Sequence, residues 1–588
     1  MRYYEILKAL DSNQLPSNLF DIEAAKHDDD FKEVYSNTKK AADIYLTGEI
    51  PSLTYEKYKL FDTTGNRSQY EDNYFGIRCR LTALAFMSIF DNDEKYILKL
   101  QDVMWSILNE YTWCLPAHLK GKSLQFDSND VNAHRRTVDL FAAETGQALS
   151  EITYLLKDRL DDIIIKRVQQ ECYDRVISAC YELSPAKNWE KETSNWCSVC
   201  AGSVGISAIY TIENNEILAR LIQKLYEDMM FYLDGFGDDG ACVEGLGYWN
   251  YGITYFTSFA ELLYQRTNGM INMFNIPKVE KIACFPSLVK LGGGTTANFS
   301  DCAPEFIFRE GILHKLKDHI PSVIIPSSKY RMKYNGAQHS RWAGFLRDFV
   351  WRKNEYRTPL ENYETDHLFE NAQWYIKNMQ SSEHWFSLAV KGGHNNESHN
   401  HNDVGHFIYQ IDGEALFIDT GADVYTKDYF GSNRYESIFA NSAGHSVPII
   451  NGKYQSHGSQ FRATKFTAEN GNATIDISKA YDTDASFVRN IIMERNGNLT
   501  VSDSFSANQI TERFVCAATD LPIVTDNKIV LKNKSVSAAI IFDDSKTDNI
   551  SITPLEGDYF EKGIHKYLID FSLAEKTKDF TININTFK

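Results

Sequence analysis

The chain has 588 residues, a length that indicates roughly two large domains or three to four ordinary ones. Hydrophobic side chains make up 43% of it and charged side chains 24%, a composition that excludes a disordered protein. The 61 basic and 79 acidic side chains give a net charge of −18, which argues against a general nucleic-acid-binding protein because such a protein needs a basic face. An acidic surface still allows a local basic pocket, so an anionic sugar remains a candidate ligand.

The first part of the chain has the period of amphipathic helices. Apolar side chains recur every three to four residues between Ile217 and Leu233, and the same period marks residues 76–90, 96–110 and 149–160. Loops rich in glycine and aspartate separate such segments. A long succession of amphipathic helices is typical of a helical toroid or solenoid, in which each helix pair completes the core of its neighbour.

From about residue 365 the pattern changes to the short alternation of β-strands. Residues 407–411 and 415–418 alternate on either side of Asp412 and Gly413, a dipeptide that favours a hairpin turn. We therefore predict an N-terminal α/α toroid over residues 1–364, followed by a C-terminal antiparallel β-sandwich over residues 365–588. No proline-rich or Ser/Gly-rich linker separates the two, so we expect them to pack closely.

Targeting signals and a disulfide framework are not evident. The amino-terminal residues lack the apolar run of a signal peptide, and no stretch of about 18 apolar residues predicts a membrane span. The ten cysteines are scattered, and Cys197 and Cys200 form a lone pair at helical spacing without a second pair to complete a zinc site. We expect a cytoplasmic protein with no membrane or nucleic-acid partner, and a homo-oligomer is compatible with the sequence.

The densest polar stretch is residues 394–403, which contains three histidines and two acidic residues. Neutral imidazole suits both transition metals and general-base chemistry near neutral pH. Downstream, Asp419 ends the second strand of the predicted hairpin and His445 follows it. Two histidines and one aspartate would fill three positions around zinc or a similar ion, and the alternative is a set of hydrogen-bonded turn residues.

The register of the hairpin affects which histidine could join Asp419. A two-residue turn places Asp419 opposite His406, with His401 on the other face of the sheet. A three-residue loop with a bulge shifts the parity and places His401 on the face of Asp419. The spacing allows both.

The helical half contains several polar or aromatic islands. Tyr248, Tyr251 and Tyr255 lie three and four residues apart, so a helix would present all three on one face. Such a stripe is either a packing face or an aromatic sugar-binding wall with one phenol placed for proton transfer. His118 and Glu144 lie in apolar surroundings, where each alone could be a satisfied core group.

Together these stretches resemble the heparinase II/III-like polysaccharide lyases. The resemblance is carried, in this order along the chain, by residues 113–118, 139–146, 195–196, 244–252, 398–405 and 441–445. That family combines an α/α toroid with antiparallel β-sheets and cleaves uronate-containing polysaccharides by β-elimination. Several members hold a divalent metal in the β domain. The resemblance therefore implies the architecture that the periodicity also predicts.

The resemblance also implies roles for individual residues. His401, Asp419 and His445 would bind a divalent ion, zinc or manganese, with a structural role. His399 would be an active-site histidine, and Tyr251 the catalytic phenol.

Asn195 would neutralise the uronate carboxylate. We expect five further side chains to contact the sugar: Trp196, Tyr248, Tyr255, His118 and Glu244. Many family members have a histidine where this chain has Trp196. The base would then be Tyr251 or His399, or the enzyme would act on only one uronate epimer.

The chemistry explains why these residue types are needed. The proton beside a uronate carboxylate becomes acidic only when hydrogen bonds offset the carboxylate charge, here from Asn195 and a neighbouring arginine. A base then removes the proton while an acid protonates the glycosidic oxygen. We predict a lyase that cleaves acidic poly- or oligosaccharides, glycosaminoglycan-like or alginate-like, to unsaturated uronate products.

Two other classes of protein remain to be separated from this one. A glycoside hydrolase on an α/α barrel would need two paired carboxylates, for which Glu144, Asp239 and Glu244 are available. A non-catalytic carbohydrate-binding protein would show no turnover. Only elimination creates a conjugated double bond, so ultraviolet absorbance of the products separates the classes.

Overall fold

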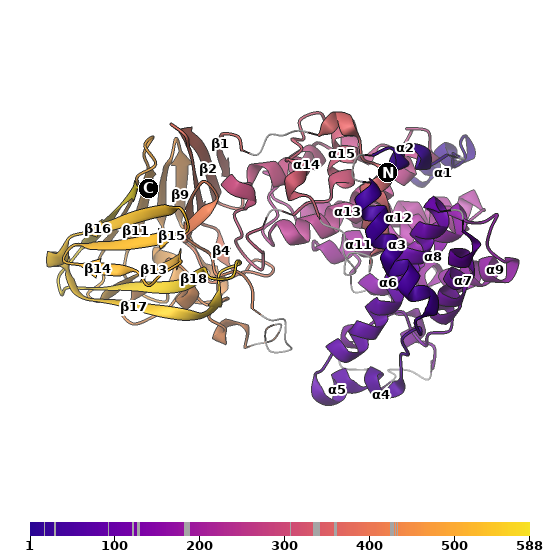
Figure 1. Ribbon diagram of the computed structural model, residues 1–588, viewed down its shortest axis with the longest axis horizontal. Helices are drawn as coiled ribbons and strands as arrows, with labels where there is room; N and C mark the ends of the chain where they lie inside the picture. Colours follow the sequence, from indigo (N-terminus) through magenta and orange to yellow (C-terminus); the bar gives the residue numbers. More distant parts are fainter. Residues whose placement is uncertain are drawn as a thin grey trace.

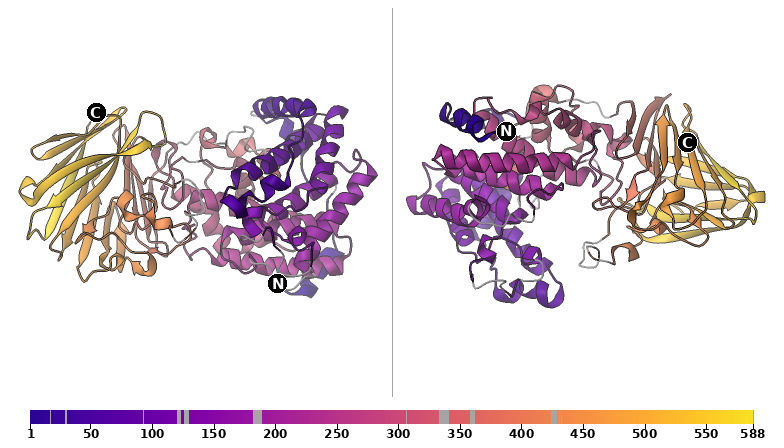
Figure 2. Two further views of the ribbon diagram at one scale, coloured as in Figure 1. Left: turned by 90° about the horizontal axis from the view of Figure 1, so that it is seen from below. Right: turned by 180° about the vertical axis from the view of Figure 1, so that it is seen from behind.

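The computed structural model describes most of the chain, namely residues 1–16, 18–28, 31–91, 93–119, 123–125, 130–181, 189–305, 307–332, 341–357, 362–423, 429, 431 and 433–587. A helical part and a β-sandwich lie next to each other along the long axis (Figure 1). The views from below and from behind show the same division (Figure 2). The predicted architecture, a helical toroid followed by antiparallel sheets, is confirmed.

The helical part consists of α-helices joined by short loops and single 3₁₀ turns. They are α1 (Tyr3–Asp11), α2 (Ile22–Lys26), α3 (Phe31–Thr47), α4 (Tyr55–Tyr58), α5 (Leu60–Thr64), α6 (Ser68–Phe90), α7 (Glu94–Leu108), α8 (Leu140–Leu155), α9 (Asp162–Cys172), α10 (Ser178–Tyr181), α11 (Asn195–Thr211), α12 (Asn215–Asp234), α13 (Leu246–Arg266), α14 (Pro277–Leu288), α15 (Glu310–His319) and α16 (Trp342–Val350). Outer helices such as α7 and α12 bury one apolar face, as their period predicts.

Helix α11 is the centre of the helical part. It is buried on nearly every side and packs against α8, α12 and α13, which explains why it has no clear polar face. Close packing depends on two glycines: a Cβ on Gly202 would lie 2.8 Å from the carbonyl oxygen of Tyr255, and one on Gly205 would lie 2.4 Å from the ring of Phe259. Helix α13, which carries the predicted tyrosine stripe, is thereby fixed against α11.

Two large antiparallel sheets form the sandwich. One has the strand order β1-β2-β3-β5-β6-β13-β18-β17, the other has the order β14-β15-β16-β19-β12-β11-β10-β9, and β4 pairs with β8. The strands are β1 (Thr365–Phe369), β2 (Trp374–Ser381), β3 (His384–Lys391), β4 (His394–Asn395), β5 (Phe407–Ile411), β6 (Glu414–Phe417), β7 (Ile449–Ile450), β8 (Gly458–Arg462), β9 (Lys465–Glu469), β10 (Asn472–Asp476), β11 (Phe487–Met493), β12 (Leu499–Phe505), β13 (Ile510–Ala518), β14 (Ile523–Thr525), β15 (Lys528–Asn533), β16 (Val536–Phe542), β17 (Thr547–Asp558), β18 (His565–Leu573) and β19 (Asp579–Phe587).

The hairpin β5–β6 has the predicted two-residue turn and also a bulge. Asp412 and Gly413 both have positive φ, +50° and +83°, and Ile411 lies opposite Glu414. The register shifts between Tyr409 and Gln410, where β6 contains one extra residue. His401 precedes β5, so the parity of the hairpin does not determine which way it faces.

The two parts share one core at their junction. Phe285 of α14 and Phe299 of the following loop contact the ring of Trp374 on β2, with ring centres 6.3 Å and 5.1 Å apart. Ile376 and Ile408 of the first sheet belong to the same buried cluster as the helices. The close packing expected from the missing linker is therefore confirmed.

The cysteines are free thiols, and both Cys197 and Cys200 are buried on α11, as expected for two residues on a helix. Among the described helices, none combines the length and the apolar character needed to cross a bilayer.

Candidate active site and metal centre

Helix α13 presents the tyrosine stripe beside the junction of the two parts. Its N-cap is Gly245, whose φ is +95° and whose Cβ, if present, would lie 2.7 Å from the Cβ of Cys302. From this start, Tyr248, Tyr251 and Tyr255 follow on one side of the helix. Tyr255 is buried, whereas the other two are partly exposed. Tyr248 and Tyr251 are therefore the more exposed members of the stripe.

Two charged side chains meet the phenol of Tyr251. Its hydroxyl donates to Oε1 of Glu144 on α8, and Nη1 of Arg341, the residue before α16, donates to the same oxygen. Nη1 of Arg341 also lies 2.7 Å from the Tyr251 hydroxyl oxygen, and the guanidinium carbon lies 4.3 Å from the centre of the Tyr251 ring. A phenol held between a cation and an anion can hold or pass a proton.

The phenol of Tyr251 is protonated in this environment. Burial raises its pKa well above the usual value, the positive charge of Arg341 acts in the opposite direction, and Glu144 raises it further. Nearby cations therefore do not bring this pKa below its usual value. The physical reason is that His399 contacts Tyr248 and that Arg341 is shared with a carboxylate.

Asn195 begins helix α11 and is held by Glu244. Nδ2 of Asn195 donates to Oε2 of Glu244 over 3.0 Å, and both side chains are buried. At the first turn of a helix, unpaired backbone N–H groups and the positive end of the helix dipole favour an anion. An amide placed there suits the binding of a carboxylate.

His118 and Trp196 are far apart in the sequence but lie next to each other in the fold. Nδ1 of His118 lies 2.7 Å from Oδ2 of Asp139, and the ring centre of His118 is 4.9 Å from that of Trp196. The tryptophan that replaces a histidine of the family motif thus contacts a different histidine. An imidazole–carboxylate pair is in this way placed close to the start of α11.

His399 approaches the tyrosine stripe from the sandwich. Its φ is +54°, a left-handed conformation in which histidine and asparagine are enriched among residues other than glycine. Its ring stacks on Tyr248 with ring centres 4.2 Å apart, and its Nδ1 lies 2.9 Å from Oδ2 of Asp301 and 3.2 Å from the Tyr248 hydroxyl. An ionised carboxylate only accepts hydrogen bonds, so Nδ1 carries the proton and the lone pair of the neutral ring lies on Nε2.

Four buried side chains form a candidate metal centre in the sandwich. Their ligand atoms lie within 4.8 Å of one another: His401, Asp403, Asp419 and His445. Within the described part of the chain, one polar atom of each lacks a hydrogen-bond partner, namely Nδ1 of His401, Oδ2 of Asp403, Oδ2 of Asp419 and Nδ1 of His445. Buried polar atoms are normally satisfied, so four such atoms together fit a divalent cation with imidazole and carboxylate ligands.

This centre contains the three residues that the motif resemblance suggested and adds Asp403 to them. The second atoms of the ligands are held by neighbours: His401 Nε2 lies 3.0 Å from Asp301 Oδ1, Lys391 donates to Asp403 Oδ1 over 2.6 Å, and His445 Nε2 lies 2.9 Å from the carbonyl oxygen of Phe439. Metal-bound histidines characteristically have such partners on the other ring nitrogen.

His406 lies beside the centre but has a different role. The backbone N–H of Ser446 donates to its Nδ1 over 2.9 Å, so Nε2 carries the proton of the neutral ring. Burial lowers the pKa of His406 to about 3, which keeps the ring neutral. Its Nε2 lies 3.5 Å from Oδ2 of Asp419, where it can orient that carboxylate but has no lone pair for a metal.

The centre predicts about one divalent ion per chain. Elemental analysis of protein purified without chelator should find zinc or manganese in that proportion, and the His401→Ala variant should lose it. The His394→Ala variant is a matched control, because His394 belongs to the same histidine-rich segment but not to the centre. An ion content near zero in the unsubstituted protein would contradict the assignment.

Sequence reasoning did not identify two charged loop residues that contact the candidate site. Arg341 and Asp301 stand in no recognisable motif and lie 90 and 98 residues away from the side chains they contact, Tyr251 and His399. Asp403 belongs to the histidine-rich segment, so its place beside His401 was the one available signal. The other two contacts depend on the tertiary fold.

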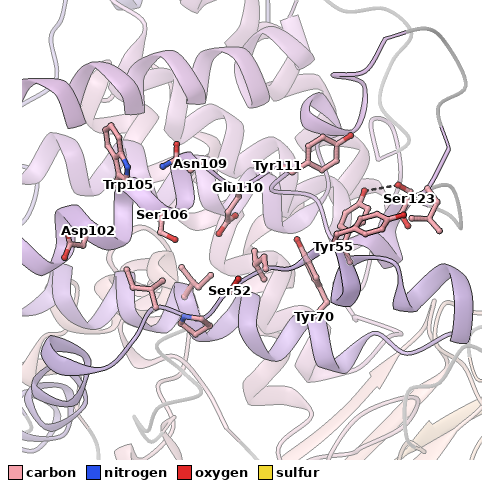
Figure 3. Close-up of a pocket in the computed structure, with 16 residues that line it drawn as sticks. Ser52, Tyr55, Tyr70, Asp102, Trp105, Ser106, Asn109, Glu110, Tyr111 and Ser123 are labelled. Atoms are coloured by element: carbon pink, nitrogen blue, oxygen red, sulfur yellow. Dashed lines mark hydrogen bonds between the residues drawn. The ribbon is translucent and has the colours of Figure 1, made fainter.

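Two cavities differ in their relation to these residues. A cavity of about 260 Å³ is lined by Tyr251, Tyr255, Arg309 and Arg341, so it opens directly on the phenol. A larger one, about 1010 Å³, lies between α4, α6 and α7; Figure 3 shows Trp105 at one end and Tyr55 and Tyr111 at the other. The larger cavity shares no residue with the Tyr251 cluster.

The comparisons with known proteins agree with this description. Residues 363–570 match the family model described as "Heparinase II/III-like, C-terminal". A crystal structure of heparinase III has a TM-score of 0.60 at 13% identity, covering 98% of this chain and 93% of that chain. Heparan sulfate lyase HepC from Pedobacter heparinus has a TM-score of 0.59 at 12% identity, covering 99% and 93%.

Chondroitin AC lyase from Streptomyces coelicolor A3, in complex with chondroitin sulphate, has a TM-score of 0.56 at 9% identity and covers 99% of this chain and 82% of that chain. The search of the curated proteins found no match. At these identities the solved structures establish the fold, and the family model identifies the sandwich. The chain therefore contains a heparinase II/III-like C-terminal domain within the fold shared by heparinase III and chondroitin AC lyase, as the motif resemblance predicted.

Proposed function

We propose that the protein is a polysaccharide lyase that cleaves a uronate-containing glycan by β-elimination. One observation carries the proposal: the protonated phenol of Tyr251 and the carboxylate-held imidazole of His399 border one aromatic stripe on α13. A proton donor and a proton acceptor are the two groups that elimination needs. The similar structures of heparinase III and chondroitin AC lyase support the same reaction class.

The first requirement of the reaction is to offset the charge of the uronate carboxylate. Asn195 supplies an amide at the N-terminal end of α11, where the N-cap residue Ser194 makes no side-chain capping hydrogen bond and the helix dipole favours an anion. Arg341 supplies a guanidinium within 2.7 Å of the Tyr251 hydroxyl. These donors would withdraw charge from the carboxylate and make the adjacent carbon-bound proton acidic.

His399 then acts as the base and Tyr251 as the acid. Because Nδ1 of His399 donates to Asp301, the neutral form of the imidazole has its lone pair on Nε2. Burial keeps the Tyr251 phenol protonated, so it can give its proton to the departing glycosidic oxygen, and Arg341 stabilises the phenolate that forms. Each positioned proton transfer contributes about 10²–10⁴-fold to the rate.

The remaining residues would contact the sugar ring. Tyr248 and Tyr255 flank Tyr251 on α13, and the cavity of about 260 Å³ beside Tyr251 provides a space for part of the chain. Trp196 and His118 pack on each other near Asn195 and would contact the neighbouring sugar. Glu244 holds Asn195, so its effect on the substrate is indirect.

The metal centre would hold zinc or manganese through His401, Asp403, Asp419 and His445. A bound ion would supply positive charge that orders the histidine-rich loop in which His399 lies. The reacting groups named above would carry out the proton transfers themselves.

The substrate would be an acidic glycan of the glycosaminoglycan or alginate class. The test is a panel of heparan, chondroitin, hyaluronan, alginate and pectin fragments, followed by ultraviolet absorbance of the conjugated product. We expect absorbance to rise with at least one substrate. Cleavage of a substrate without any absorbance would overturn the proposal and favour hydrolysis, and no cleavage across the panel would favour a binding protein.

A further inference from the structure

Asp301 connects the two halves of the site. It lies in the loop between α14 and α15, in the helical part of the chain, where its neighbour Ser300 has a φ of +66°. The loop is held to the residues just before α13, because Oγ of Ser300 donates to the carbonyl of Val243 over 2.8 Å and Cys302 packs on Gly245. The position of Asp301 is therefore tied to the helix that carries the tyrosine stripe.

Within the described residues, the hydrogen bonds of the Asp301 carboxylate come from the sandwich side. Oδ2 lies 2.9 Å from His399 Nδ1 and 3.0 Å from Arg434 Nη2. Oδ1 lies 3.0 Å from His401 Nε2, 2.6 Å from the Tyr429 hydroxyl and 2.9 Å from Arg434 Nη2. A carboxylate has about four acceptor positions, so this one is fully used.

The two histidines are held by opposite ring nitrogens. Asp301 accepts from Nδ1 of His399, which leaves the lone pair of that ring on Nε2. It accepts from Nε2 of His401, which leaves the lone pair on Nδ1, a buried nitrogen with no hydrogen-bond partner within the described residues and so the ring atom available to the metal centre. One carboxylate thus selects the tautomer of the proposed base and that of a metal ligand.

The geometry points to Asp301 as a positioning residue that couples the divalent-metal centre to His399. Metal binding fixes His401, His401 fixes the Asp301 carboxylate, and the carboxylate fixes the His399 ring against Tyr248. The coupling to metal is independent of the reaction, whereas its consequence for turnover rests on the proposed function.

The experiment measures Zn²⁺ affinity of the full chain by calorimetry after chelation and buffer exchange. The Asp301→Asn variant should bind Zn²⁺ about 10–100-fold more weakly than the unsubstituted protein, because an outer-shell partner of a metal-bound histidine is lost. The His399→Asn variant is the matched control. It removes the ring on the other side of the same carboxylate, keeps an amide donor, and should leave the Zn²⁺ affinity nearly unchanged.

Turnover at saturating Zn²⁺ separates the two roles of Asp301. With the metal centre filled, the Asp301→Asn variant should still show a reduced kcat with little change in KM, because His399 remains misoriented. Full recovery of kcat would overturn the coupling to His399. An unchanged Zn²⁺ affinity would overturn the coupling to the metal, whatever the protein's reaction is.

A measurement on the unsubstituted protein keeps the test valid if Asp301→Asn does not fold. In protein with isotope-labelled histidine, the ring signal of His399 is identified by its loss in His399→Asn. Addition of Zn²⁺ to the metal-free protein should shift that signal, although His399 is not itself a ligand of the centre. A His399 signal that ignores Zn²⁺ while the signals of His401 and His445 respond would overturn the proposal.

Discussion

Replacing Tyr251 by phenylalanine should lower kcat by at least about 10²-fold, the lower end of the range for a lost acid–base group. The change removes one oxygen atom and leaves the aromatic ring at this position of α13. Arg341 and Glu144 still pair with each other, so the network around them is retained. We therefore expect KM and the thermal midpoint to change little, and steady-state kinetics with a thermal melt measures both.

Tyr255→Phe is the matched control for this prediction. Tyr255 lies one helical turn further along α13, is buried, and has its ring centre 5.8 Å from that of Tyr251. Arg341 donates a hydrogen bond to the Tyr251 hydroxyl, whereas within the described residues no hydrogen bond joins Arg341 to Tyr255. A normal kcat in Tyr251→Phe together with a large loss in Tyr255→Phe would move the proton donor to Tyr255.

Replacing His399 by asparagine should lower kcat by about 10²–10⁴-fold, because the proposed base is removed. Asparagine suits this position for two reasons. It tolerates the left-handed backbone conformation with φ of +54°, and its amide can still donate to Asp301 in place of Nδ1. The loss would therefore come from the missing Nε2 rather than from a disturbed loop.

The Tyr248→Phe variant is the control for His399. It keeps the stacked ring at 4.2 Å and removes only the hydroxyl that lies 3.2 Å from Nδ1, so its effect on kcat should be small. Comparable losses in Tyr248→Phe and His399→Asn would indicate that Tyr248 takes part in the proton transfer. An unaffected kcat in His399→Asn would leave Tyr251 as both acid and base.

Local patterns in the sequence predict most of the fold. The apolar period between Ile217 and Leu233 places α12 within about two residues of its ends, because a helix is specified by side chains three and four residues apart. Asp412 and Gly413 place the hairpin turn equally well. The bulge in β6 escapes prediction, since no glycine or proline marks the extra residue.

The residues of the candidate site also fall into a predictable and an unpredictable group. Tyr251 and His399 stand in contiguous motifs that can be read from the sequence. Arg341 and Asp301 lie in two distant loops, and only the tertiary fold brings these loops to Tyr251 and His399. The raised pKa of Tyr251 could not be predicted from the sequence, because it depends on burial and on Glu144 rather than on neighbouring residues in the chain.

The masses of the products of a defined uronate tetrasaccharide test the central claim most directly. β-Elimination adds no atoms from water, so the two fragments must together weigh as much as the substrate, and one of them must absorb ultraviolet light. Hydrolysis by carboxylates such as Glu144 and Glu244 would instead give fragments whose combined mass exceeds that of the substrate by one water molecule. We expect the first result for the unsubstituted protein, and the second would contradict the assignment of this site to a lyase.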